Sequence, residues 1–271
     1  MIIGIDIGST TTKAISLENG KVIKKLKTKA ADAVTSATGA FGKMIIENGI
    51  GMPEISRIMI TGAGATKIEG NLFGIPTKKV NEISAIGTGG MFLSGQDNIV
   101  IVNVGTGTAI IEARKDKITH LGGSGVGGGT ILGLAKSLLS LSDFKDFMEL
   151  AGSGDLAQVD LRLEDIMGKD FSFLNKKNTA SNFGKMLDTA GSEDIALGIL
   201  NLVYQVIGII SVFAARSRNI DRVIVTGSGS HNPLGQKILS EISDLYSVIF
   251  DYPEDAEYTT AIGAGLLTAE H

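Results

Sequence analysis

Residues suited to bind phosphate gather in two glycine-dense stretches near the middle of the chain. The first, 103–108, follows the apolar, β-branched run 99–102, which is typical of a buried strand. The second, 122–130, precedes a helical pattern over 131–139. Glycine amides have no Cβ in their way, and amides that open onto a helix N-terminus bind anions, above all phosphate. The alternative explanation is two ordinary tight turns.

A similar motif at the start of the chain favours phosphate binding over simple turns. It consists of an apolar strand pattern, a loop rich in Gly, Ser and Thr, and a second strand pattern. Asp6 falls opposite Asn103, and Gly8 falls opposite Gly105. Asn19-Gly20 then separates two strand-like runs, which is a strong hairpin signal. A unit that occurs twice predicts a duplicated architecture with a nucleotide held between the copies.

The glycine loops do not fit two common nucleotide-binding motifs. No loop ends in Gly-Lys-Ser/Thr, so none is a Walker A loop. The N-terminal loop leads into another strand pattern and not into a helix, so it is not a dinucleotide fingerprint. A third glycine loop, 227–230, follows the strand pattern 222–226. Asn232, just before the next helical pattern, could cap that helix or contact a ligand.

The elements that would position these loops form an α/β pattern. Two strands, a helix over 30–48, a strand at 57–61, a short strand at 77–80 and a helix from 82 to about 91 predict one α/β domain. From about residue 97 the scheme repeats. We therefore expect domains 1–96 and 97–271, with the last helical segment, 259–269, as a candidate to pack back on the N-terminal domain. Residues 143–190 are more polar and helical in pattern.

The composition excludes several classes of function. A chain of 271 residues with 43% hydrophobic and 20% charged residues is typical of a folded protein. The net charge of −4, the absence of tryptophan and the lack of a basic cluster with aromatic residues argue against nucleic-acid binding. No cysteine is present, which excludes disulfides and Cys-ligated clusters. His120, His231 and His271 lack metal-ligand spacing.

One segment has the length of a membrane span. Residues 195–215 carry no charge, but they include Asn201 and Gln205, which share a helical face. A helix buried in a protein core is therefore the preferred interpretation, and we expect no membrane partner. The N-terminus shows no secretory signal pattern, so we expect a cytoplasmic protein.

Taken together and in their order along the chain, these motifs resemble those of a known protein family. The segments 6–10, 103–108 and 227–229 resemble the three nucleotide-binding segments of the superfamily of acetate kinase, sugar kinases, heat-shock chaperones and actin. Within it, the chain is similar to type II pantothenate kinases over nearly its whole length, including 80–82, 122–129, 160–161, 181–184 and 227–232. The resemblance implies duplicated actin-like, ribonuclease H-like α/β domains with the nucleotide in the cleft between them.

The resemblance also implies an activity. It is the ATP-dependent phosphorylation of pantothenate to 4'-phosphopantothenate, the first step of coenzyme A biosynthesis, by a magnesium-dependent homodimer. The family's catalytic base matches Glu82, its phosphate-contacting lysine matches Lys13, and its metal-organising aspartate matches Asp6. The positions expected to bind ATP are Gly8, Ser9, Thr10, Gly105, Thr106, Gly107, Gly127, Gly128, Gly129, Gly227 and Ser228. The positions expected to bind the acceptor are Glu82, Thr106, His120, Gly123 and Ser124.

General chemistry agrees with the three catalytic roles. Phosphoryl transfer needs an attacking hydroxyl in line with the γ-phosphorus and cations that neutralise the developing charge. Asp6 could hold Mg²⁺ directly or through water, because a hard cation prefers carboxylate oxygen. Lys13 could reach a phosphate as a point charge. Glu82 could accept the hydroxyl proton, although an acidic residue in a first helical turn is also favoured by the helix dipole alone.

The chain departs from the family at one position. Where the family commonly has an arginine that contacts the pantothenate carboxylate, this chain has Thr119-His120-Leu121. A neutral histidine cannot reproduce a bidentate guanidinium. Three explanations stay open: a partly protonated His120 binds the carboxylate, Arg114 or another cation replaces the arginine, or the acceptor differs.

Two other functions remain as alternatives. The N-terminal motif also resembles ATPases that activate CoA-dehydratases, but those proteins bridge their dimer with a cysteine-bound iron–sulfur cluster, and this chain has no cysteine. The second alternative is a non-catalytic regulator that binds a nucleotide and in which Glu82 has only a structural role.

Overall fold

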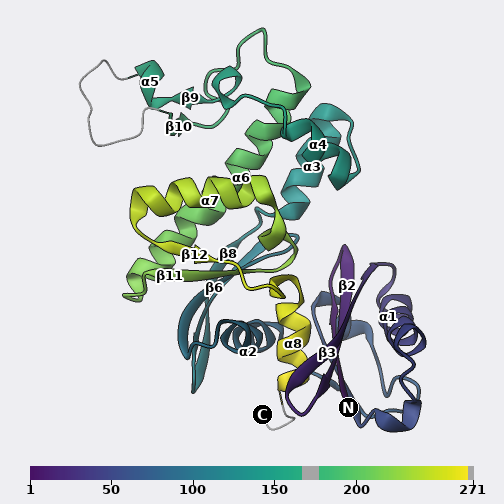
Figure 1. Cartoon of the computed structure of the whole chain (residues 1–271). Helices are drawn as coiled ribbons and strands as arrows, with labels where there is room; N and C mark the ends of the chain where they lie inside the picture. Colours follow the sequence, from purple (N-terminus) through teal and green to yellow (C-terminus); the bar gives the residue numbers. More distant parts are fainter. Residues whose placement is uncertain (167–176, 268–271) are drawn as a thin grey trace.

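Each of the two repeated motifs begins a five-stranded sheet. The computed structural model describes residues 1–166 and 177–267, and Figure 1 shows the two sheets in separate lobes. The N-terminal sheet has the order β3-β2-β1-β4-β5. Its strands are β1 (Ile2–Ile7), β2 (Thr11–Glu18), β3 (Lys21–Lys29), β4 (Arg57–Thr61) and β5 (Thr77–Lys79). The C-terminal sheet has the order β12-β11-β6-β7-β8. Its strands are β6 (Asn98–Val104), β7 (Thr108–Arg114), β8 (Lys117–Ser124), β11 (Arg222–Thr226) and β12 (Ile249–Asp251).

The two sheets repeat one topology. In each, the first three strands pair antiparallel in chain order. The fourth strand pairs in parallel with the first, and the fifth pairs in parallel with the fourth. The strands β1 and β6 are therefore equivalent, as the alignment of Asp6 with Asn103 predicted. The duplicated α/β fold expected from the sequence is confirmed. The predicted hairpin is present as well, with Asn19 and Gly20 at φ values of 49° and 75°.

The helices divide into outer layers and a layer between the sheets. The helix α1 (Ala33–Asn48) packs on the N-terminal sheet from outside, and Asp32 caps it by accepting hydrogen bonds from the amides of Val34 and Thr35. The helices α2 (Glu82–Ser94) and α8 (Thr259–Leu266) pack against each other between the lobes (Figure 1). The former contacts the C-terminal sheet and the latter the N-terminal sheet.

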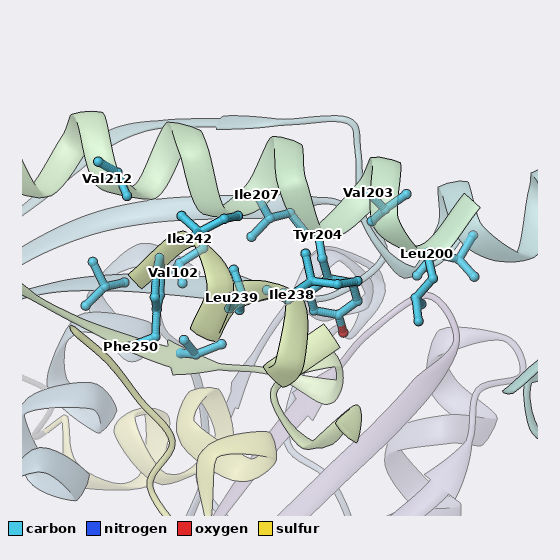
Figure 2. Packing of buried hydrophobic residues seen from close by; sticks show 14 of the residues in the cluster. Val102, Leu200, Val203, Tyr204, Ile207, Val212, Ile238, Leu239, Ile242 and Phe250 are labelled. Atoms are coloured by element: carbon cyan, nitrogen blue, oxygen red, sulfur yellow. The ribbon is translucent and has the colours of Figure 1, made fainter. Parts of the chain in front are cut away.

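The largest core lies in the C-terminal lobe. There α6 (Ser192–Ser217) and α7 (Pro233–Tyr246) pack on the sheet, and α3 (Gly128–Leu139) and α4 (Phe144–Ala151) pack beside α6. Figure 2 shows the side chains of α6 meeting those of α7 and the sheet, with the Tyr204 ring among them. The uncharged run 195–215 thus belongs to a core helix. It is long and apolar enough to span a membrane, but 61% of its most apolar window is buried within the protein.

In the polar segment 143–190, the structure differs from the helical pattern expected from the sequence. Beyond α4, the elements among its described residues are short: a 3₁₀ turn at Leu156–Gln158, β9 (Leu161–Arg162), α5 (Leu163–Ile166) and β10 (Thr179–Ser181). They are organised by the fully buried carboxylate of Asp160, which accepts hydrogen bonds from Thr179, Asn201 and the amide of Phe183. A tertiary network of this kind overrides the local helical pattern.

The terminal helix contacts the N-terminal sheet. Its N-terminal part, α8, contacts β1, β2 and β4 of the first lobe, while residues 268–271 of the expected segment, including His271, lie outside the described residues. The positions at which the chain divides into two domains, near residues 96 and 97, stay a prediction.

Candidate active site

A cavity of about 610 Å³ lies where the repeated loops meet. It receives residues from both lobes and from the layer between them. Most of the residues expected from the sequence to bind ATP or acceptor line it: Asp6, Gly8, Ser9, Thr10, Lys13, Glu82, Gly105, Thr106, Gly107, Ser124, Gly128, Gly129, Gly227 and Ser228. His120, Gly123 and Gly127 are not among the lining residues.

The two repeated loops meet at the wall of this cavity. The Ser9 hydroxyl, after β1, lies 3.3 Å from the Thr106 hydroxyl, after β6. Because these strands are equivalent in the two sheets, their ends bring the two loops to the same place. A ligand between the loops would therefore contact both lobes.

The glycines at the start of α3 hold the loop after β6 through backbone hydrogen bonds. The amides of Gly128 and Gly129 donate to the carbonyls of Gly105 and Thr106, each at 2.9 Å. The amide of Gly127 donates to the Thr130 hydroxyl at 3.1 Å. A Cβ on Gly127 would lie 2.7 Å from the Thr106 carbonyl oxygen, so a larger residue would push the loop and the helix apart. Whether these amides also contact phosphate stays a prediction.

Asp6 and Lys13 form a charged pair at the cavity wall. They are cross-strand partners on β1 and β2, and only 8% and 6% of their surfaces are exposed. Burial raises the pKa of Asp6 to about 6, although Lys13 counteracts the rise. Burial also lowers the pKa of Lys13, and Asp6 opposes that change. Each charge thus depends on the other to stay ionised in a site with little water.

Glu82 joins this pair from the layer between the lobes. It is the first residue of α2, whose start is fixed by the Asn81 side chain, which accepts a hydrogen bond from the Ser84 amide at 3.1 Å. Glu82 is exposed to the open cavity, yet the surrounding walls raise the pKa of its carboxyl group, and Lys13 partly offsets this. A carboxylate with a raised pKa in a cleft is suited to accept a proton near neutral pH.

Helix N-termini surround the cavity. The lining residues Glu82, Gly128 and Thr260 belong to the first turns of α2, α3 and α8. The positive ends of these helix dipoles point to the same space, which favours an anionic ligand.

Part of the cavity wall is apolar. It is lined by Ile131 and Leu132 of α3, Phe144 of α4 and Tyr204 of α6. Tyr204 is buried, and its hydroxyl donates to the Gly229 carbonyl at 2.7 Å, beneath the third glycine loop. The sequence pattern around these residues indicates only a buried helix face, so it does not mark them as site residues.

A further glycine loop follows the strand β4 in the N-terminal lobe, where the sequence pattern has Gly62 and Gly64. Gly62 follows β4 with φ of 86°, and a Cβ there would lie 2.6 Å from Asp6 Oδ1. Its counterpart Gly227 follows β11 with φ of 82°, and a Cβ there would lie 2.9 Å from Asn103 Oδ1. Since β4 lies beside β1 and β11 lies beside β6, these two loops are equivalent, as Asp6 and Asn103 are.

Two cationic candidates from the sequence lie elsewhere. His120 is exposed on β8 and does not line the cavity. Arg114, at the far end of β7, is hydrogen-bonded to Glu112 at 2.6 Å and does not line the cavity either. Lys27 of β3, which the sequence analysis did not consider, does line it.

The cavity offers one carboxylate suited to a magnesium ion that also contacts a ligand. Among residues 1–166 and 177–267, no group of three or more His, Cys, Asp or Glu side chains could hold a metal ion alone. Mg²⁺ in phosphate-binding sites is usually held by one or two carboxylates together with substrate phosphates. Asp6 fits that pattern, since the described part of the chain shows no hydrogen bond to its nearly buried carboxylate.

Comparison with known proteins identifies the family. The Fumble family model matches residues 98–265. A type II pantothenate kinase from Bacillus anthracis is 32% identical, with 97% of this chain and 95% of that protein covered. A type II pantothenate kinase from Staphylococcus aureus is 28% identical, with coverage of 97% and 98%.

Solved structures show the same two-domain fold at lower identity. The activator of 2-hydroxyisocaproyl-CoA dehydratase from Clostridium difficile, with bound ADPNP, has a TM-score of 0.67 at 17% identity, covering 98% of this chain and 92% of the other. A ROK family glucokinase from Streptomyces griseus, in complex with glucose and AMPPNP, has a TM-score of 0.62 at 14% identity, covering 98% of both chains. On the strength of its sequence relatives and the family match, this chain belongs to the type II pantothenate kinase family.

Proposed function

We propose that this protein transfers the γ-phosphoryl group of ATP to the 4'-hydroxyl group of pantothenate. The observation that carries the proposal is the meeting of Asp6, Lys13 and Glu82 in one cavity between two duplicated glycine loops. The relatives named type II pantothenate kinases indicate the acceptor.

The cavity has the two parts that ATP requires. The glycine loops and helix N-termini suit the triphosphate, and the apolar lining residues Leu132, Phe144 and Tyr204 suit the adenine base. In this arrangement the triphosphate lies next to Lys13, whose ammonium group neutralises part of its charge.

Asp6 is the residue that would hold Mg²⁺, directly or through water. When bound, the ion neutralises charge on the phosphate oxygens during transfer. Lys13 is the cross-strand partner of Asp6, and its charge opposes the rise in the pKa of the Asp6 carboxyl group.

Glu82 is the proposed general base. Its carboxylate accepts the proton of the acceptor hydroxyl as the hydroxyl oxygen forms a bond to the γ-phosphorus and the bond to the ADP oxygen breaks. ADP and 4'-phosphopantothenate leave, and Glu82 returns its proton to solvent. Because Glu82 begins a capped helix, its backbone is fixed relative to the second sheet, on which that helix packs.

An acceptor panel tests this function against the alternatives. ADP release would be measured with no acceptor, with pantothenate, with pantetheine and with other small hydroxylated compounds. The proposal expects release only with pantothenate or a close analogue. Release without any acceptor would instead support an ATPase of the dehydratase-activator type, whose fold this chain shares. Nucleotide binding without release would support a regulator.

Two further expectations belong to the same proposal. The homodimer and the cytoplasmic location expected from the sequence stay predictions. The oligomeric state can be measured by light scattering on the purified chain.

A further inference from the structure

The cavity contains a second lysine next to the one expected to contact phosphate. Lys27 of β3 is the cross-strand partner of Lys13 on β2, so both side chains leave the same face of the sheet. Leu26 points to the other face, into the N-terminal core. Two ammonium groups thus lie side by side at the cavity wall.

Lys27 differs from Lys13 in its exposure and its partner. Its side chain is 40% exposed, and its ammonium nitrogen lies 2.9 Å from Glu257 Oε2, just before α8. Glu257 is not among the residues that line the cavity, whereas Lys27 is. The Glu257 side chain is only 17% exposed, so the pair is open to water on the lysine side alone. Water weakens the attraction there, so a ligand anion can compete with Glu257 for Lys27.

The substrates present more negative charge than Lys13 can neutralise. ATP carries a triphosphate, and pantothenate carries a carboxylate in addition. Within the described residues that line the cavity, Lys13 and Lys27 supply the cationic side chains, because His120 and Arg114 lie elsewhere. The sequence left open whether another cation takes the place of the family's arginine.

We propose that Lys27 binds an anionic oxygen group of the substrates, either the acceptor carboxylate or the terminal phosphate of the nucleotide. In this proposal, which rests on the function proposed above, Glu257 is the internal counter-charge that the ligand anion displaces. Lys27 is therefore a specificity-determining residue, and Glu257 sets how strongly it binds.

The neighbouring pair on the same strand provides a matched control. Lys25 is two residues away on the same face of β3 and forms an ion pair with Asp255, but it does not line the cavity. Its side chain is 38% exposed, nearly the same as that of Lys27. Loss of either pair should affect the fold alike, while only loss of Lys27 should affect a ligand.

The experiment compares Lys27→Met, Glu257→Gln, Lys25→Met and Asp255→Asn. Steady-state KM values for ATP, pantothenate and pantetheine would be measured, together with AMPPNP affinity by calorimetry. For the anion that Lys27 binds, we expect Lys27→Met to raise KM about tenfold, because a charge-assisted hydrogen bond is lost. Glu257→Gln keeps a hydrogen-bond acceptor but removes the competing charge, so we expect it to lower the same KM about threefold.

The substrates distinguish the two anions. A change for pantothenate but not for pantetheine, which lacks the carboxylate, assigns Lys27 to the acceptor. A change for ATP and AMPPNP assigns it to the phosphate. The proposal is overturned if Lys27→Met shifts no ligand more than Lys25→Met does, or if Lys27→Met and Glu257→Gln shift KM in the same direction.

If the proposed kinase function is wrong, the experiment gives a result that differs from failure of the Lys27 proposal. In that case the wild-type protein shows no pantothenate-dependent ADP release and no pantothenate binding by calorimetry, which excludes the carboxylate. AMPPNP affinity in the four variants then decides the proposal alone. Unchanged affinity in Lys27→Met would reject it.

Discussion

At the scale of single residues, the site works by placing a few charges where water is scarce. The Asp6 carboxylate and the Lys13 ammonium group are nearly buried, and each is less stable as an ion than it would be in water. A ligand that brings phosphate and Mg²⁺ would compensate both. The empty site is therefore electrostatically unfavourable, and ligand binding relieves that cost.

The raised pKa of Asp6 predicts a pH dependence. Since its folded-state pKa is about 6, above the usual 3.8, the carboxyl group takes up a proton as the pH falls through about 6 and then cannot bind Mg²⁺. We expect kcat/KM to fall on this acid side and the midpoint to move to lower pH at higher Mg²⁺ concentration. Profiles at two Mg²⁺ concentrations check this, and a midpoint that does not depend on Mg²⁺ would contradict the role of Asp6.

The same pKa has a consequence for the stability of the ligand-free protein. A carboxyl group whose pKa is higher in the folded state stabilises the fold below its unfolded pKa, and this contribution is lost as the pH rises through about 6. The Asp6 carboxylate, which the reaction needs in its ionised form, therefore lowers the stability of the ligand-free fold above about pH 6.

Tyr204 predicts an effect confined to the nucleotide. Tyr204→Phe keeps the buried ring but removes the hydrogen bond to the Gly229 carbonyl, so the third glycine loop loses its support. We expect ATP KM to rise several-fold, pantothenate KM to change little, and the free energy of unfolding to fall by about 1 kcal/mol. Tyr246→Phe, at the end of α7 beneath Arg216, is the control and should leave ATP KM unchanged. An unchanged ATP KM in Tyr204→Phe would show that the loop needs no such support.

At the scale of elements, the layer formed by α2 and α8 determines where Glu82 lies. The two helices approach so closely that a Cβ on Gly263 would lie 1.8 Å from the carbonyl oxygen of Ala85. The approach is between backbones, so no side-chain rotation can relieve it. The position of the proposed base therefore depends on a glycine far from it in sequence.

Gly263→Ala tests this dependence. We expect a loss of about 1–3 kcal/mol in unfolding free energy and a fall in kcat, since α2 must move. Gly39→Ala is the matched control, because Gly39 is exposed within α1 and a Cβ there meets nothing within 4 Å. That change should stabilise the protein by about 0.5–1 kcal/mol and leave kcat unchanged. Equal stability of the two variants would contradict close packing of the two helices.

The elements also show where sequence reasoning succeeds. Strands with apolar, β-branched runs such as 99–102 were predictable, because their burial on both faces leaves a local pattern. The segment around Asp160 was not, because its conformation depends on hydrogen bonds to Thr179 and Asn201 from other parts of the chain. The roles of Tyr204 and Lys27 were hidden for the same reason, since only the fold brings them to the cavity.

At the scale of the whole molecule, duplication explains why the site lies between the lobes. Two copies of one sheet place their first loops face to face, as the 3.3 Å separation of the Ser9 and Thr106 hydroxyls shows. The copies differ where the chemistry requires it: Asp6 in one lobe corresponds to Asn103 in the other. A single carboxylate, and not two, thus faces the proposed phosphate site from these equivalent positions.

The central claim is that Glu82 removes the proton of the acceptor hydroxyl in a cleft that binds ATP without its help. The most direct measurement compares wild-type protein with Glu82→Gln for the rate of 4'-phosphopantothenate formation and for AMPPNP affinity. We predict that the rate falls about a hundredfold or more, because the glutamine cannot accept the proton, while AMPPNP affinity stays close to that of the wild type. Near-normal formation of 4'-phosphopantothenate by Glu82→Gln would contradict the account.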